Sequence, residues 1–168
     1  MEAPPTIELD DAFVLDGWRL EDAASHRVFA EDADAARFLG WSVEEARAAP
    51  DSYYVDGVRQ FQDEWAAGSR LSLAIRQRET GEAVGAVELR PEGDVARVSY
   101  VVAPTFRGMG LAPRALDAFL EWARRELSLR RALLSCHVEN VASQRVAAKC
   151  GFTLTAREGT DLRFRRDL

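Results

Sequence analysis

The strongest constraint on the fold is a strand-like run that leads through a glycine turn into a long helix. Residues 95–103 are rich in β-branched and aromatic side chains, which favours a strand. Pro104, Gly108 and Gly110 then interrupt the pattern. In residues 112–127 the apolar side chains recur with helical spacing, at Leu116, Phe119, Leu120, Ala123 and Leu127. Because a further β-rich segment follows this helix, the order predicts one parallel crossover in the sheet.

The other periodic segments predict an α/β (α+β) fold around a mixed, mostly antiparallel sheet of about seven strands. Besides 95–103, strands are predicted at 13–20, 70–77, 83–90, 132–138, 152–156 and 162–166. Helices are predicted within 21–49, over 56–67 and over 141–150. Residues 1–12 are acidic and rich in proline, so we expect a flexible arm before a single domain at 13–168.

Composition limits the functional classes. The net charge of −6 is uneven: residues 1–67 carry 16 acidic and 5 basic side chains, whereas residues 68–168 carry 12 acidic and 17 basic ones. This asymmetry fits either a cationic substrate at one end and an anionic cofactor at the other, or two solvated faces. No basic stripe with interleaved aromatics predicts nucleic-acid binding. No apolar run of membrane-spanning length, secretory signal or metal-ligand spacing is present, so we expect a cytoplasmic protein without a metal.

The glycine turn has the features of an anion site. Glycine allows backbone conformations and close ligand approach that other residues prevent. The loop N–H groups and the positive end of the helix dipole converge, which suits a pyrophosphate. Pro113 is compatible with the first helical turn, where N–H groups lack helical partners.

The segment also resembles motif A of the GNAT acetyltransferases, R/Q-x-x-G-x-G/A. Arg107, Gly110 and Ala112 stand at its defined positions. The resemblance implies a GNAT-like sheet with helices on both faces and acetyl-CoA as cosubstrate, without a metal. It implies cofactor contacts through the end of the preceding strand and through the loop, at Val101, Val102, Arg107, Gly108, Met109, Gly110, Leu111 and Ala112.

A second segment, residues 140–152, resembles motif B of the branch that contains the ribosomal-protein alanine N-acetyltransferases. It reads N-x-x-S, then a helix, then Gly151-Phe152, about 30 residues after motif A. The resemblance implies that Asn140 holds the pantetheine arm and that Ser143 lies near the thioester sulfur as a catalytic acid. A water is the rival acid, because Ala147 stands where many relatives have a tyrosine. Taken alone, the segment also fits a helix cap, a C-terminal glycine and a core phenylalanine.

The general base is the point at which the sequence departs from the family. Many relatives have a glutamate on the fourth strand, where this chain has Arg97. The remaining candidates are Glu88, His137 and Glu139, and the sequence does not choose among them. Residues 21–67 correspond to the variable substrate lip of the family, in which Trp41, Tyr53, Tyr54 and Trp65 either line an amine pocket or pack in the core.

The resulting hypothesis is an acetyl-CoA-dependent N-acetyltransferase that acts by direct attack of an amine on the thioester. The acceptor is a primary amine of a small molecule, a peptide or a protein N-terminus. The alternative is a catalytically weak acyl-CoA-binding or sensor module with the same fold. We expect neither nucleic-acid nor membrane partners, and whether the chain forms a homodimer stays open.

Overall fold

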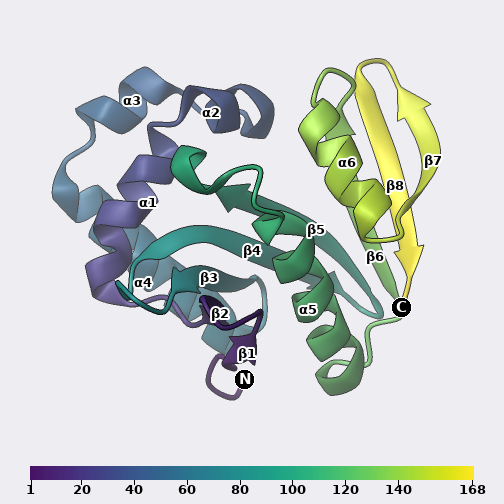
Figure 1. The fold of residues 1–168 in the computed structure, drawn as a ribbon, viewed down its shortest axis with the longest axis horizontal. Helices are drawn as coiled ribbons and strands as arrows, with labels where there is room; N and C mark the ends of the chain where they lie inside the picture. Colours follow the sequence, from purple (N-terminus) through teal and green to yellow (C-terminus); the bar gives the residue numbers. More distant parts are fainter.

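The computed structural model describes all 168 residues and contains one eight-stranded sheet (Figure 1). The strands are β1 (Ile7–Glu8), β2 (Phe13–Asp16), β3 (Leu71–Gln77), β4 (Ala83–Glu92), β5 (Val95–Val102), β6 (Arg131–His137), β7 (Thr153–Glu158) and β8 (Asp161–Asp167). Their order across the sheet is β1-β2-β3-β4-β5-β6-β8-β7, and only β5 and β6 are parallel neighbours. The mixed, mostly antiparallel sheet and its single crossover are therefore confirmed.

The parallel pair β5–β6 is short, and this shapes the middle of the sheet. Pairing covers only Val95–Arg97 of β5, against Arg131–Leu133 of β6. By contrast, β5 pairs with β4 along its whole length. The outer half of β5 is thus hydrogen-bonded on one edge and open on the other, so the sheet splays between β5 and β6 (Figure 1).

Six helices surround the sheet: α1 (Ala23–Ala30), α2 (Ala33–Leu39), α3 (Val43–Ala48), α4 (Asp51–Ala67), α5 (Leu111–Glu126) and α6 (Val141–Lys149). Side chains of α5 pack with Leu71, Leu73 and Ile75 of β3 in the main core. Side chains of α1 and α4 pack with Ala74 and Ala86 in a second cluster. Since alternate residues of a strand face opposite sides, the two clusters lie on opposite faces of the sheet. Helices on both faces are confirmed.

The N-terminal quarter differs most from the predicted elements. Within residues 1–12, β1 pairs with β2, and the Asp10 carboxylate accepts hydrogen bonds from the backbone N–H groups of Ala12 and Phe13. The predicted strand 13–20 ends at Asp16. Helix α4 begins at Asp51, directly after Pro50, rather than at residue 56. The earlier start has a physical reason, because proline tolerates a helix start and its own N–H is not needed there.

Candidate functional site

The glycine loop forms an open cradle at the start of α5. A short 3₁₀ turn, η2 (Pro104–Phe106), follows β5, and Gly108 and Gly110 adopt positive φ angles of 79° and 72°. A Cβ built on either glycine meets nothing within 4 Å, so the space above the backbone is free. Gly110 caps α5, whose first turn holds no acidic residue. A free cradle at a helix N-terminus fits an anionic pyrophosphate.

Arg107 points away from this cradle. Its Nε donates to the carbonyl oxygen of Val102 at 3.1 Å, and its guanidinium pairs with Asp32 and Asp34 at the start of α2. Of the other loop residues, Met109 is exposed and Leu111 is buried against the core. The loop therefore presents mainly backbone N–H groups at the cradle, and Arg107 ties it to the start of α2.

Helix α6 brings the second motif to the splay. The Asn140 side-chain oxygen accepts a hydrogen bond from the Ser143 backbone N–H at 3.0 Å, so Asn140 caps this helix. The Ser143 hydroxyl is free of that cap and lies 2.7 Å from the hydroxyl of Tyr100 on β5. This hydrogen bond joins β5 to α6 across the edge that β5 and β6 leave open.

Tyr100 is a polar residue that sequence reasoning missed. Desolvation raises its pKa, while the hydrogen bond with Ser143 acts in the opposite direction. Tyr100 therefore stays protonated at neutral pH, and either hydroxyl can donate the hydrogen bond that joins Tyr100 and Ser143. A lone tyrosine in a strand pattern gives no sign of a partner 43 residues later in the chain.

Alternation along β5 separates two environments. The side chains of Val98, Tyr100 and Val102 pack on the α5 face, whereas Val101 packs with the α1–α4 cluster. The backbone N–H and C=O groups also alternate in direction along β5. The Ala103 N–H donates to the carbonyl oxygen of Val84 in β4. The register and the antiparallel alternation then turn the backbone groups of Tyr100 and Val102 toward the open edge, and those of Val101 toward β4.

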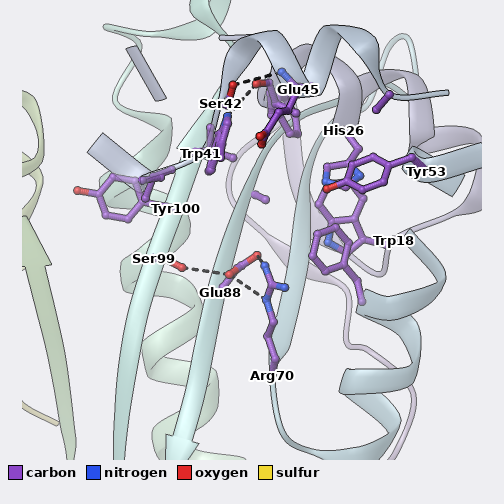
Figure 2. A pocket seen from close by; sticks show the side chains of 18 of the residues that line it. Trp18, His26, Trp41, Ser42, Glu45, Tyr53, Arg70, Glu88, Ser99 and Tyr100 are labelled. Atoms are coloured by element: carbon purple, nitrogen blue, oxygen red, sulfur yellow. Dashed lines mark hydrogen bonds and ion pairs between the residues drawn. The ribbon is translucent and has the colours of Figure 1, made fainter. Parts of the chain in front are cut away.

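A cavity of about 620 Å³ lies on the face of the sheet that α1 and α4 cover, called here the α1–α4 face (Figure 2). Its walls come from α1, α3, α4 and the connection between α2 and α3. Its floor comes from β4, β5 and Arg70, which precedes β3, with Ser99, Tyr100 and Val101 at the border. In Figure 2 the Tyr100 ring points away from the cavity, so the strand separates the cavity from the side on which Ser143 lies.

Glu88 lies in the cavity floor and is saturated with partners. Its carboxylate pairs with Arg70 through both oxygens and with Arg90 at 3.2 Å, and it accepts a hydrogen bond from Ser99 at 3.1 Å. Ser72 lies 3.5 Å away on the same side. Of the three predicted candidates for the base, Glu88 is the one that lines this cavity.

His137 and Glu139 lie elsewhere, near the start of α6. The Nδ1 atom of His137 accepts a hydrogen bond from the Glu139 backbone N–H at 3.2 Å, and its ring packs on Phe38. The Glu139 carboxylate pairs with Arg37 of α2 at 2.5 Å. Neither residue lines the cavity.

His26 is a second residue that sequence reasoning missed. It lies on α1, lines the cavity, and packs edge-on against Tyr54 and Phe61. Desolvation by this packing lowers the pKa of His26. Its imidazole is therefore neutral at neutral pH. A histidine in an amphipathic helix resembles many structural histidines, so the sequence alone gave no reason to select it.

The lip aromatics divide between the two interpretations. Trp41 and Tyr53 line the cavity. Tyr54 is buried, and its hydroxyl donates to the Ala46 carbonyl oxygen at 2.5 Å. Trp65 stacks with Phe119 of α5 in the main core. Two of the four thus pack structurally.

No group of three or more His, Cys, Asp or Glu side chains is arranged to hold a metal ion. None of the helices combines the length and the apolar character needed to cross a bilayer.

Comparison with known proteins gives the class to which this fold and site correspond. Residues 13–153 match the family model described as an acetyltransferase (GNAT) domain. The chain also resembles an uncharacterized N-acetyltransferase, YnaD, of Bacillus subtilis, with 36% identity over 54 residues. That match spans about a third of each protein, 32% of either chain.

Solved structures agree in fold over almost the whole chain. The RimL ribosomal L7/L12 alpha-N-protein acetyltransferase in complex with coenzyme A superposes with a TM-score of 0.85 at 21% identity, covering 98% of both chains. The microcin C7 self-immunity acetyltransferase MccE, in complex with acetyl-CoA and AMP, gives 0.82 at 18% identity, covering 95% of this chain and 94% of its own. RimJ of Mycobacterium smegmatis superposes with a TM-score of 0.82 at 20% identity. The match covers 99% of this chain and 90% of the RimJ chain.

The chain belongs to the GNAT acetyltransferase family. The family model describes this class as an acetyltransferase domain, and the superposed MccE structure holds acetyl-CoA.

Proposed function

We propose that this protein transfers the acetyl group of acetyl-CoA to a primary amine that enters the α1–α4 cavity. The observation that carries the proposal is the position of β5. Its open edge and the Tyr100–Ser143 hydrogen bond lie on one side, and the cavity lies on the other. A thioester held at the splay and an amine held in the cavity would meet at the same strand.

The cosubstrate contacts follow from the cradle and the splay. The loop Gly108–Ala112 would bind the pyrophosphate through backbone N–H groups. The Asn140 amide uses its oxygen to cap α6, which leaves its NH₂ group free to donate to the pantetheine arm. Val101 and Val102 would border the acetyl group, and the orientation of Val102 makes its N–H the better oxyanion donor of the two.

The transfer itself is a direct attack. The amine nitrogen forms a bond to the thioester carbonyl carbon, and the resulting oxyanion accepts a hydrogen bond from the Val102 N–H. The carbon–sulfur bond then breaks, the thiolate takes a proton from Ser143, which Tyr100 orients, and the Ser143 oxygen regains a proton from solvent water. The amine loses its proton to a water in the cavity. Among Glu88, His137 and Glu139, we propose Glu88 as the residue that holds this water, because it lines the cavity.

Two measurements test the proposal. Acetyl-CoA should raise the melting temperature, and ligand at about 100 times its dissociation constant adds roughly 2.7 kcal/mol of stability. Free coenzyme A should then appear when amines are supplied. The absence of a thermal shift at millimolar acetyl-CoA would contradict the cofactor site itself.

The saturated carboxylate of Glu88 and the alanine at position 147 favour one rival, an acyl-CoA-binding or sensor module with weak catalysis. A thermal shift without coenzyme A release, across small amines, peptides and a ribosomal-protein N-terminal peptide, would support that module instead.

A further inference from the structure

The mouth of the cavity presents two exposed aromatic side chains. Trp41 is 39% exposed and Tyr53 59%, and they are the two aromatics among the exposed large hydrophobic residues. Both line the cavity. The Trp41 indole N–H donates to the Ala30 carbonyl oxygen at 2.8 Å, and Tyr53 packs edge-on against Tyr54. These contacts hold the two rings at the mouth, where they remain accessible to a ligand.

The same cavity lining contains an unpaired carboxylate. Glu45 of α3 is exposed and lines the cavity, and it takes part in none of the ion pairs of the molecule. Its backbone N–H is fixed by the Ser42 hydroxyl at 3.2 Å. In Figure 2, Glu45 lies at the top of the pocket, with Trp41 on the left and Tyr53 on the right.

The other charged groups of the cavity are already engaged. Arg70 pairs with Glu88 and Glu64 and covers the Phe61 ring, with its guanidinium carbon 4.6 Å from the ring centroid. Arg90 pairs with Glu88. The lowered pKa of His26 leaves that ring uncharged at neutral pH. The charge without a partner is therefore negative and shares the cavity lining with exposed aromatic rings, a combination that attracts organic cations.

We propose that the acceptor is a small organic cation with an aromatic or other apolar body. Glu45 attracts its ammonium to the mouth, Trp41 and Tyr53 hold its body there, and the amine nitrogen reaches β5 after it has lost its proton. This inference rests on the proposed acetyl transfer. The cavity volume lies within the range of pockets that enclose small molecules. A free carboxylate on the acceptor would be disfavoured, because Glu45 would repel it and both arginines of the floor are engaged.

A matched pair of amines tests the acceptor class. The amine 2-phenylethylamine and phenylalanine differ by one carboxylate, and ethylamine lacks the ring. We expect the highest kcat/KM for 2-phenylethylamine. Tyr53→Ala should reduce its advantage over ethylamine, whereas Tyr53→Phe should keep it. Equal or better turnover of phenylalanine, or of a peptide amine, would overturn the inference.

The role of Glu45 has a matched control in its neighbour. Glu44 lies on the same helix, is exposed and does not line the cavity. Glu45→Gln should raise KM for 2-phenylethylamine about tenfold, the effect of a hydrogen bond to a charged group. Glu44→Gln should leave it within about twofold, as expected for a surface charge. Equal values for the two variants would overturn the inference.

Direct binding separates failure of this inference from failure of the proposed function. Trp18 and Trp41 line the cavity, so their fluorescence reports on 2-phenylethylamine in the absence of turnover. Saturable binding that Glu45→Gln weakens and Glu44→Gln does not, without coenzyme A release, would support the ligand class and overturn acetyl transfer. Acetylation of other amines without binding of 2-phenylethylamine would overturn the ligand class alone.

Discussion

For Ser143, a role in capping α6 and a role as catalytic acid predict different effects of removing its hydroxyl. Its backbone N–H donates to the Asn140 side-chain oxygen that caps α6, while its hydroxyl contacts Tyr100. Removing the hydroxyl should therefore leave the cap intact. Ser143→Ala should slow turnover by about 10²–10⁴-fold, the usual contribution of general acid–base catalysis. Steady-state rates and thermal melts of the same variant provide the measurement.

A loss of stability with normal turnover would contradict the catalytic role of Ser143. A rate loss below about tenfold would point to a water as the acid. Tyr100→Phe is the companion variant: it keeps the ring and removes the hydroxyl, so it should lower kcat with a smaller change in KM.

Gly110 tests whether the loop approaches a ligand. Its positive φ disfavours any side chain, and valine adds β-branching. Gly110→Val should abolish acetyl-CoA binding in a folded protein. Gly93→Val is the control, because Gly93 has φ 67° and an equally open Cβ position in the β4–β5 turn. Calorimetric titration should find affinity lost in the first variant and retained in the second. Equal affinity in both would mean that the loop is only a connector.

Elements were predictable where one pattern dominated. The crossover from β5 through α5 to β6 follows from a β-rich run, a glycine turn and helical spacing in sequence. Strand β1 was missed because two residues carry no period, and its pairing depends on the turn that Asp10 stabilises. The first turn of α4 was missed because Pro50 fits the end of the helices predicted within residues 21–49 as well as the start of a new helix.

Helix α6 provides a test at the scale of an element. Asn140→Asp keeps an oxygen for the Ser143 N–H and loses the NH₂ donor, whereas Asn140→Ala loses both. The aspartate variant should melt near the wild type yet bind acetyl-CoA more weakly, by about tenfold for one lost hydrogen bond. The alanine variant should also lose about 1 kcal/mol of stability with its cap. Unchanged affinity in the aspartate variant would contradict a role of the Asn140 amide in binding.

At the scale of the molecule, the cavity was the least predictable part. The distances that define it join α1, α3 and α4 to the sheet, and no local pattern encodes them. The sequence selected Glu88 by its strand position but contained no sign of the arginine pair that saturates it. Trp41 and Tyr53 could not be separated from Tyr54 and Trp65, because burial depends on which way each helix face turns in the fold.

Burial of His26 predicts a pH dependence of global stability. Desolvation lowers its folded pKa, opposed in part by the nearby Glu88 and aided by Arg70. Between that pKa and the unfolded value of about 6.5, the unfolded chain binds more protons. The free energy of unfolding should thus fall as pH drops below about 6.5. His26→Gln should reduce this fall in urea titrations at several pH values, and parallel curves for both proteins would contradict the prediction.

Side chains of β5 alternate between the two faces of the sheet, so substitutions at neighbouring positions act on different sides of the strand. Ser99 and Val101 line the cavity, while Tyr100 and Val102 pack on the face of the sheet that α5 covers, although all four are consecutive in the chain. Under the proposed transfer, substitution of Ser99 therefore alters the acceptor side of β5, and substitution of Tyr100 alters the donor side. Descendants of such a chain can diversify in the amine that they modify while keeping Tyr100 and Val102 unchanged.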